Sequence, residues 1–363
     1  MGWDEKLLQG VLNNCNLFAA FMSNYFVKGL NSFLLMFALA VSVYSQDNGA
    51  DGIRIMFYNT QNLFDIYDDS LKDDNDFTPG GVLHWNYSRY KKKINSLYQV
   101  IIAAGEWSPP AVVALCEVEN RKVLEDLISN TYLSKYGYSI IHEESSDQRG
   151  IDVCLIYRKE CAEVLSSRYL IPEQIQKEDF RTRSVLYTRL LVCGDTLHLI
   201  VNHWPSRRGG ALAGEDMRLL IAGMVKEVCD SVGTSGRGHA KIIICGDFNS
   251  SPDGVEIKLL TDRERPGISL FNLSERSAEK GRGTYRYKGI WEMIDQVIVS
   301  ETLLNCKSGL FTGEDYFQVF SPEFLLERDP VYAGFSPFPT YRGYRYHGGF
   351  SDHLPVLTDL LVR

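Results

Sequence analysis

An apolar run that ends abruptly in polar residues is the first candidate for chemistry in this chain. Residues 242–245 read Ile-Ile-Ile-Cys, which is typical of a buried β-strand, and Gly246, Asp247, Phe248 and Asn249 follow without a spacer. Gly, Asp, Asn and Ser are common turn residues, so a tight turn is one interpretation. The other is a strand that holds an acid and an amide at its carboxyl end for a chemical purpose.

Polar side chains end or interrupt several other apolar runs in the same way. An unpaired charge is costly to bury at such a place, so each of these groups is expected to have a partner. The residues are Asn59, Glu117, Asn202 with His203, Asp247 with Asn249, Asp295, and Asp352 with His353. So many ends suggest a shared site, and carboxylates and amides without thiolates suit a hard divalent cation such as Mg²⁺ or Mn²⁺.

Seven stretches together resemble a known family. In chain order they are FYNTQNLF, LCEVEN, RGIDVCLIYR, VNHWPS, GDFNSSP, WEMIDQVIVS and FSDHLPV, and they span residues 57–356. They resemble the endonuclease/exonuclease/phosphatase superfamily, which has the deoxyribonuclease I-like fold, and look most like its secreted bacterial branch. The resemblance implies an α/β fold, a four-layer α/β sandwich with two packed, mostly antiparallel sheets flanked by helices. It also implies metal-dependent hydrolysis of phosphate esters at one edge of the sandwich.

The resemblance assigns metal ligands. Asn59 and Glu117 resemble the family's metal-binding amide and carboxylate, and Asp352 is expected to join the surroundings of the metal. Few protein groups suffice for Mg²⁺, because it keeps several waters. Mg²⁺ is therefore the expected cofactor, with Mn²⁺ or Ca²⁺ as alternatives.

The resemblance also assigns catalytic roles. His353 resembles the catalytic histidine and Asp295 the carboxylate that orients it, which would fix the imidazole tautomer. Asp247 resembles the residue that orients or deprotonates the attacking water, and Asn249 a group that bonds the phosphoryl oxygens. His203 resembles a second histidine that contacts phosphate or acts as a general acid. Together these groups predict phosphoryl transfer by positioning and charge neutralisation.

Several basic or polar residues are more ambiguous. Arg149 and Arg207 are candidate phosphate contacts, because arginine suits bidentate phosphate binding, although surface ion pairs are the alternative. Gln61 stands where some nucleases of the superfamily carry an acid, which leaves a second metal open. The cationic run Arg89–Lys93 begins a helical pattern and is interpreted as a solvated helix face, with a phosphate contact as the alternative.

The elements that must position these side chains mix strands and helices without strict alternation. Helical patterns occupy about 86–104 and 120–130 and begin again at Met217, between apolar runs that predict strands. This order predicts packed sheets with helices outside them. No linker rich in Pro, Gly or Ser divides the later chain, so residues 46–363 are predicted to form one domain.

The amino-terminal residues resemble an export signal. Residues 33–43 are apolar throughout, Lys28 precedes them, and the small residue Ser45 marks the expected cut. The run is shorter than the about 20 residues that cross a bilayer, although a membrane anchor is the alternative. We therefore expect residues 1–45 to be an upstream extension plus a signal peptide near residues 22–45. The mature protein would be secreted or periplasmic.

Composition limits the classes of function. The net charge of −8 argues against nonspecific adhesion to nucleic acid but leaves room for a local basic groove. The 8 cysteines show no C-x-x-C pair, so a disulfide framework is disfavoured, with one pair such as Cys154 and Cys193 left open.

The sequence therefore predicts a monomeric, metal-dependent phosphodiesterase, foremost a secreted or periplasmic nuclease with nucleic acid as substrate and no evident protein partner. A phosphatase or lipid phosphodiesterase, with a small phosphate ester or lipid head group as substrate, is the alternative. A non-catalytic binding module is the weaker rival. The aromatic segment 315–349 could cover the core, stack bases or touch a membrane.

Overall fold

The computed structural model describes residues 52–173, 182–207 and 211–363. These residues belong to one unit of the chain, Asp51–Arg363. The predicted signal peptide lies outside them. Within the described part of the chain, no helix has both the length and the apolar character needed to cross a membrane.

The first large sheet has seven strands in the order β13-β19-β1-β2-β4-β3, with β14 also beside β19. Its central strands β1 and β2 are parallel, and β1 pairs with β19 in the antiparallel sense. The strands are β1 Gly52–Leu63, β2 Val112–Val118, β3 Tyr138–Ile141, β4 Asp152–Arg158, β13 Leu310–Phe311, β14 Phe317–Val319 and β19 Val356–Val362.

The second large sheet has six strands in the order β5-β6-β7-β8-β12-β9. Its central strands β7 and β8 are parallel, and the other pairs are antiparallel. The strands are β5 Glu163–Leu170, β6 Val185–Val192, β7 Asp195–His203, β8 Lys241–Asp247, β9 Leu270–Asn272 and β12 Asp295–Ser300.

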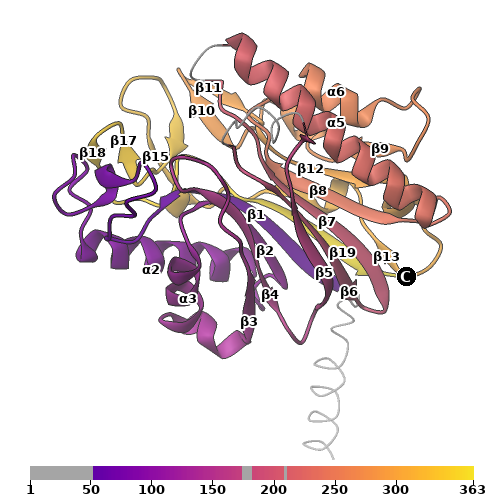
Figure 1. Ribbon diagram of the computed structural model, residues 1–363, viewed down its shortest axis with the longest axis horizontal. Helices are drawn as coiled ribbons and strands as arrows, with labels where there is room; N and C mark the ends of the chain where they lie inside the picture. Colours follow the sequence, from indigo (N-terminus) through magenta and orange to yellow (C-terminus); the bar gives the residue numbers. More distant parts are fainter. Residues whose placement is uncertain (1–51, 174–181, 208–210) are drawn as a thin grey trace, which may run out of the picture. The chain divides into compact units, whose positions relative to one another are not determined.

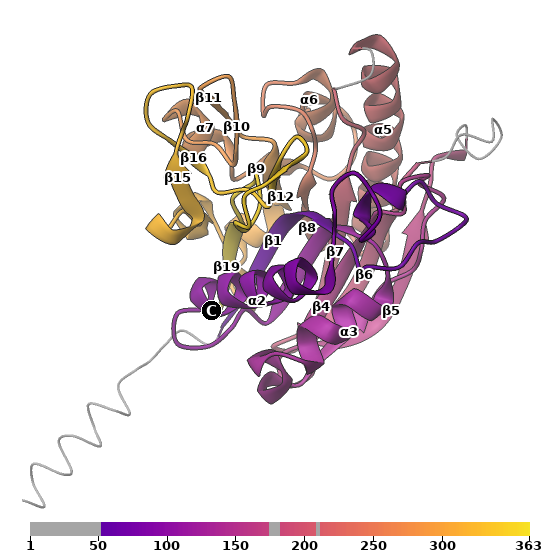
Figure 2. The same cartoon turned by 90° about the vertical axis from the view of Figure 1, so that its left-hand side faces the viewer.

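Helices cover the outer faces of the two sheets (Figures 1 and 2). Helices α2 and α3 lie against the first sheet, and α5 and α6 lie against the second. Their bounds are α2 Tyr87–Ala104, α3 Arg121–Ser129, α5 Ala211–Ser235 and α6 Val255–Thr261, with the short helices α7 Glu275–Glu279 and α8 Glu301–Asn305. Helix, sheet, sheet and helix form the four layers, so the predicted α/β sandwich is confirmed.

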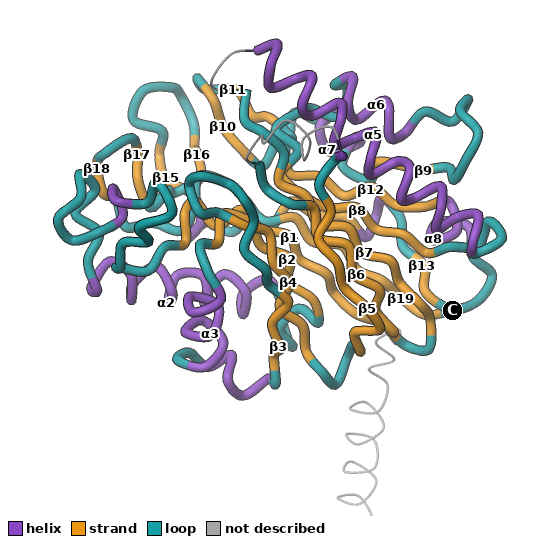
Figure 3. Tube along the Cα trace, viewed as in Figure 1, coloured by secondary structure: helices purple, strands orange, loops and turns teal. Residues whose placement is uncertain are grey.

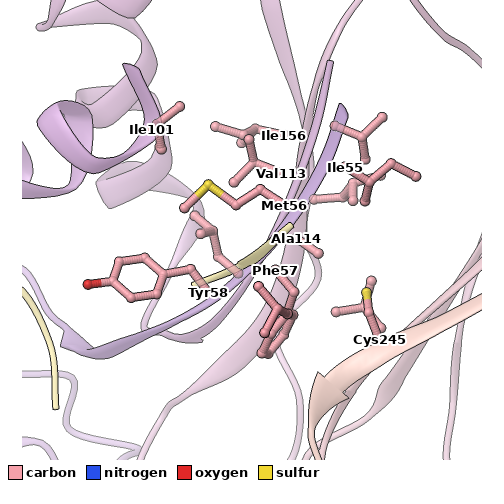
Figure 4. Packing of buried hydrophobic residues seen from close by; sticks show 14 of the residues in the cluster. Ile55, Met56, Phe57, Tyr58, Ile101, Val113, Ala114, Ile156 and Cys245 are labelled. Carbon is pink, nitrogen blue, oxygen red and sulfur yellow. The ribbon is translucent and has the colours of Figure 1, made fainter. Parts of the chain in front are cut away.

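The strands alternate between two buried environments. Figure 4 shows Met56 and Tyr58 of β1 on the side of Ile101 from α2, whereas Phe57 lies on the side of Cys245 from β8. All five side chains are at most 1% exposed. Because β1 is buried on both faces, it reads as a nearly continuous apolar run, as expected for the central strand of a sandwich.

Loops and small hairpins gather at one end of the sheets (Figure 3). This region contains β10 Tyr285–Tyr287, β11 Ile290–Glu292, β15 Leu326–Arg328, β16 Phe335–Pro337, β17 Tyr341–Arg342 and β18 Arg345–Tyr346. Short 3₁₀ turns occupy Asn75–Phe77, Tyr132–Tyr136, Glu314–Tyr316 and Glu323–Leu325. Within the aromatic segment 315–349, Leu325 and Tyr341 belong to the core, but Val331 and Phe335 are exposed. The core-covering interpretation therefore holds for only part of that segment.

The cationic run on α2 is not a solvated face throughout, which corrects the sequence interpretation. Lys91 and Lys92 are exposed, but Lys93 is 1% exposed. Its Nζ donates to Thr340 Oγ1 and to the carbonyl oxygen of Phe350, both at 2.6 Å. Burial lowers the pKa of Lys93 to about 7, against the opposing charges of Asp352 and Glu117. Lys93 thus ties α2 to the segment that leads into Ser351 and Asp352.

Candidate active site

Three predicted site residues lie side by side on neighbouring strands of the second sheet. His203 on β7 pairs with Asp247 on β8, and Asp247 pairs with Asp295 on β12. Side chains at paired positions of adjacent strands point to the same face, so strand register alone brings these groups together. His353 reaches them from the segment before β19, which belongs to the first sheet. The site therefore lies where the two sheets meet.

Asp295 and His353 form a buried pair. Their side chains are 1% and 7% exposed, and His353 Nδ1 lies 2.7 Å from Asp295 Oδ2. Burial alone would lower the pKa of His353, but the charge and hydrogen bond of Asp295 raise it well above its usual value. The ring of Tyr285 lies 5.0 Å from the imidazole ring, centroid to centroid. The structure thus favours a protonated His353 whose other nitrogen, Nε2, lies 3.9 Å from Asp247 Oδ2.

Asp247 sits at the centre of the group. Its Oδ1 accepts from the backbone nitrogen of Asn249 at 2.9 Å, and its Oδ2 accepts from Asn59 Nδ2 at 3.0 Å. Burial first, and the charge of Asp295 second, raise its pKa to about 7. A carboxylate with a pKa near neutrality can exchange a proton at physiological pH.

His203 has the opposite environment. Its Nε2 lies 3.7 Å from Asp247 Oδ2 and 3.8 Å from Glu117 Oε1, but Nη1 of Arg183 is closer, at 3.1 Å. Burial and the charge of Arg183 hold the pKa of His203 well below its usual value. His203 is therefore neutral.

Arg183 was not among the residues predicted from the sequence. Its side chain is 6% exposed, lies 3.7 Å from Asp147, and its Nε has no hydrogen-bond partner in the structure. A signal was present, because Arg183 precedes β6 and the antiparallel ladder of β6 and β7 places that end beside His203. Orphaned buried donors are rare and point to a function or a missing partner.

The three predicted metal ligands belong to the first sheet or to its connections: Asn59 lies on β1, Glu117 on β2, and Asp352 in the segment before β19. Asn59 is 1% exposed, and Glu117 Oε2 accepts from the backbone nitrogen of Asn62 at 2.9 Å. The backbone of Glu117 has a φ of 58°, an uncommon value for a residue with a side chain, which is often found at functional positions. Burial raises the pKa of Asp352, and the charge of Glu117 raises it further. Two carboxylates that repel each other at one place have the donor chemistry that a hard divalent cation requires.

Another trio of side chains could also hold a metal. Ligand atoms of Asp247, Asp295 and His353 lie within 4.8 Å of one another. However, Asp295 Oδ2 is already engaged with His353 Nδ1. A protonated imidazole has no lone pair for a metal, so we favour the Glu117 and Asp352 side for the cation.

The loop after β8 is held in a strained conformation by its neighbours. Asn249 has a φ of 47°, and its Nδ2 donates to the carbonyl oxygen of Trp204 at 3.0 Å. Ser250 Oγ donates to Glu256 Oε2 at 2.9 Å, and Glu256 Oε1 accepts from Arg218 Nε at 2.5 Å. Arg218 also donates to the carbonyl oxygen of Pro205, so one buried ion pair fixes the loops after β7 and β8 together.

The predicted phosphate contacts line the same cleft, which has a volume of about 1010 Å³. Arg149 is half exposed and lies 3.7 Å from Asp147, and Arg207 forms an exposed ion pair with Glu292. Both ion pairs are partly solvated and therefore weak, so both guanidinium groups remain available to an anion. Gln61, by contrast, uses both ends of its amide on Thr340 and Tyr341 and has a structural role.

The fold has counterparts among solved structures. An endonuclease/exonuclease/phosphatase from Bacteroides vulgatus is 14% identical, with a TM-score of 0.53 over 86% of this chain and 99% of that one. The human Nocturnin catalytic domain with bound sulfate is 16% identical, with a TM-score of 0.51 over 86% and 96%. TDP2 from D. rerio, complexed with a single-strand DNA product, is 14% identical, with a TM-score of 0.50 over 85% and 98%.

At such identities these similarities concern the fold alone. A search of curated proteins finds no match. The profile that describes the Endonuclease/Exonuclease/phosphatase family, however, matches residues 54–361, which is nearly the whole described chain. The chain therefore belongs to the endonuclease/exonuclease/phosphatase family.

Proposed function

We propose that this protein is a divalent-metal-dependent phosphodiesterase that cleaves nucleic acid outside the cytoplasm. One observation carries the proposal. Within a single cleft, Asp247 with a pKa of about 7 faces a charged His353 on one side and a neutral His203 on the other. A base, a cation and a neutral hydrogen-bonding group around one position suit an attack of water on phosphorus.

The roles of the residues follow from these charges. Asp247 accepts a proton from the attacking water, because its pKa lies near the working pH. His353, held by Asp295, donates from Nε2 to a phosphoryl oxygen and offsets its charge. Asn249 and Arg183 bind the remaining oxygens, and Asn59 keeps the carboxylate of Asp247 oriented.

The residues present fit a divalent cation. Glu117 and Asp352 would hold it with the help of Asn59, since these groups offer hard oxygen donors with little cationic compensation apart from Lys93. When bound, the cation would supply charge neutralisation at the phosphate. Mg²⁺ is the expected ion.

Two features support nucleic acid as the substrate. Arg149, Arg183 and Arg207 line the cleft, and Tyr285 and Tyr341 line it as well. Cations that contact a phosphate backbone beside aromatic rings are typical of single-strand binding. The export signal expected at residues 22–45 is the basis for a secreted or periplasmic location.

A lipid phosphodiesterase is the second candidate. The β10–β11 hairpin, the loop before β16 and the first residue of β16 expose apolar side chains near the cleft. These are Ile290, Val331, Tyr332 and Phe335, at 68%, 77%, 41% and 57%. Arg286 joins these two segments, since it donates to the carbonyl oxygens of Ala333 and Phe335 at 2.6 Å. Exposed apolar side chains at the mouth of a cleft also suit a lipid surface.

An activity panel separates these candidates. The protein would be assayed with Mg²⁺, Mn²⁺ and Ca²⁺ on single-stranded DNA, duplex DNA, RNA, sphingomyelin vesicles and a chromogenic bis-phosphodiester. We expect cleavage of nucleic acid with Mg²⁺ or Mn²⁺. Cleavage of sphingomyelin alone would favour the second candidate, and no turnover of any substrate would contradict both.

The metal assignment has a matched control within the panel. Glu117→Gln removes one proposed ligand charge and should lose most metal-dependent activity at limiting Mg²⁺. Glu125→Gln makes the same chemical change at an exposed position of α3 and should keep wild-type activity. Wild-type turnover by Glu117→Gln would show that the metal lies elsewhere.

A further inference from the structure

The loop between β3 and β4 carries an acid that faces two arginines of the cleft. Asp147 is 7% exposed, whereas the residues on either side of it, Ser146 and Gln148, are exposed. Its Oδ2 lies 3.7 Å from Nε of Arg183, and its Oδ1 lies 3.7 Å from Nε of Arg149. All three charged side chains line the cleft. One carboxylate is thus shared between two candidate phosphate contacts, with one oxygen toward each.

Asp147 is the counter-ion of the buried Arg183 side chain. That side chain is 6% exposed, and burial lowers the pKa of its guanidinium. Among the described acids, Asp147 opposes this effect most strongly, ahead of Glu117 and Asp247. A distance of 3.7 Å is too long for a hydrogen bond, so charge alone holds the Nε edge of Arg183 toward Asp147. A buried cation that loses its counter-ion is strongly destabilised, so this pair is expected to persist.

Asp147 is itself fixed by hydrogen bonds. The backbone nitrogen of Arg149 donates to Asp147 Oδ1 at 2.9 Å, and the backbone nitrogen of Asp147 donates to Ser145 Oγ at 3.3 Å. Lys72 Nζ donates to the carbonyl oxygens of Ser145 and Asp147, at 2.8 Å and 3.1 Å. Because Lys72 belongs to the loop between β1 and α2, the turn around Asp147 is anchored from outside as well as from within.

The same turn is attached to the segment that carries Arg183. Ser146 Oγ donates to the carbonyl oxygen of Thr182 at 3.2 Å. Thr182 directly precedes Arg183 in the chain. The acid and the arginine are therefore linked twice, once by charge and once by a hydrogen bond between the segments from which they come.

This arrangement sets the direction of the arginine. A guanidinium is planar and rigid, so a partner at its Nε edge also sets where its two Nη groups lie. Nη1 of Arg183 lies 3.1 Å from Nε2 of His203, and the same Nε2 lies 3.7 Å from Asp247 Oδ2. The fork of Arg183 is thereby kept on the side of the cleft where its proposed contact with a phosphoryl oxygen requires it.

We propose that Asp147 is a positioning residue that holds the guanidinium of Arg183 for binding to a phosphoryl oxygen of the substrate. The inference rests on the proposed function, because it concerns how the same phosphate is bound. It also has a sign that can be tested. The charge of Asp147 by itself repels a phosphate and would weaken binding, whereas its positioning of Arg183 strengthens binding.

The sign can be measured on the full chain without turnover. Inorganic phosphate raises the Tm of a protein that binds it, and the rise of each variant above its own phosphate-free Tm gives an apparent Kd. Asp147→Asn removes the charge and keeps an oxygen that can accept from the backbone of Arg149. We expect its Kd for phosphate to rise about 10-fold, as for the loss of one charged hydrogen bond. Glu144→Gln, at an exposed position of the same loop, should match the wild type.

A double-variant cycle shows whether Asp147 acts through Arg183. In kcat/KM on a chromogenic bis-phosphodiester, Asp147→Asn should cost about 10-fold in the wild-type background. In the Arg183→Gln background it should cost less than about 2-fold, because no guanidinium is left to position. If Asp147 only supported the fold of its loop, the two factors would be equal.

The outcomes separate this inference from the proposed function. Tighter phosphate binding by Asp147→Asn, or equal factors in the two backgrounds, would overturn the inference and leave the proposed function in place. If the wild type cleaves no phosphodiester, the proposed function fails, and the phosphate Kd still decides the role of Asp147. If Asp147→Asn does not fold, Lys72→Met loosens the same turn and should show the same dependence on Arg183, with Lys91→Met at an exposed position of α2 as its control.

Discussion

Two histidines share one cleft but carry opposite charge. His353 is bonded to Asp295 and has a raised pKa, whereas His203 is in contact with Arg183 and has a lowered one. Both imidazoles are less than 10% exposed, and both lie within 4 Å of the same Asp247 carboxylate. Burial alone would favour the neutral form of each, so the charged neighbour decides between them.

The comparison shows how one residue type can serve two purposes at one phosphate. A charged imidazole offsets negative charge, and a neutral one can accept or pass on a proton. Asp295 begins β12 of the second sheet, whereas His353, which it keeps protonated, lies in the segment before β19 of the first sheet. Arg183, which helps to keep His203 neutral, lies just before β6, the strand next to β7.

The largest expected effect is the loss of activity when Asp295 or His353 is replaced. If the carboxylate holds the imidazole in its charged form, Asp295→Asn and His353→Ala should each lower kcat/KM by about 10² to 10⁴, as for other acid–base groups. The double variant should lose little more than either single one, because residues that act as a unit are not additive. The measurement is kcat/KM on a phosphodiester substrate for all three variants.

Multiplicative losses in the double variant would show that the two residues act independently. His353 would then need another orienting group, and Asp352 is too close in sequence to be the first choice. Retained folding is checked by comparing Tm, since Asp295 Oδ1 is buried without a partner and its loss could also relieve strain.

The second prediction concerns the protonation of His203. Arg183→Gln removes the nearby cation, so the pKa of His203 should rise and the acid limb of the pH–rate profile should move to higher pH. Loss of a charged hydrogen bond to substrate should also lower kcat/KM by about 10- to 100-fold. Arg183→Lys keeps the charge and should leave the acid limb near its original position. An unchanged limb in Arg183→Gln would mean that His203 does not titrate in the rate profile.

The sequence predicted one side of this comparison and not the other. Asp295 and His353 each stand out, because an acid or imidazole within an apolar run needs a partner and the two stretches match known motifs. Arg183 stands in a polar stretch, RTRS, where arginine is unremarkable. Only the register of the hairpin formed by β6 and β7 places it beside His203, and local composition does not reveal that register.

Lys93 shows the same limit. Its neighbours Lys91 and Lys92 are solvated, and local composition does not distinguish the three. The helical period places Lys93 beside Ile94 and Leu97, but its partners, Thr340 and Phe350, are about 250 residues away along the chain. The layers of the fold follow from local patterns, whereas buried polar contacts of this kind depend on the finished packing.

The third prediction concerns this buried lysine, which supports the His353 side. Lys93→Met would leave Thr340 and the carbonyl of Phe350 without their donor, at a cost of about 1–3 kcal/mol. We expect a lower Tm and a decrease in kcat/KM smaller than that of Arg183→Gln, because the loop before Asp352 and His353 would be less fixed. Lys92→Met, at the exposed neighbouring position, should match the wild type. Equal Tm and kcat/KM of the two variants would show that Lys93 does not support the loop before Asp352 and His353.

The smallest expected effect is that of replacing a third histidine, His198. It lies outside the active site, so it tests how burial and a nearby arginine affect a histidine pKa apart from catalysis. It lies on β7, with Nδ1 2.7 Å from Tyr187 Oη and Arg189 as its partner on β6. Burial and the charge of Arg189 lower its pKa to about 4. The folded protein therefore keeps His198 neutral at pH values where the unfolded chain, with a pKa of about 6.5, binds a proton.

This difference fixes the sign of the pH dependence. His198 costs no stability above about pH 6.5, and its penalty grows as the pH falls from there toward 4. His198→Gln should therefore lose less Tm than the wild type between pH 7 and pH 5, with kcat/KM unchanged at pH 7. His239→Gln, at an exposed position, serves as the control and should follow the wild type. If His198→Gln and the wild type lose the same Tm over this range, the pKa of His198 is not lowered in the folded protein. Burial beside an arginine would then not suffice to keep a histidine neutral in this fold, and the neutral state of His203 would need another cause.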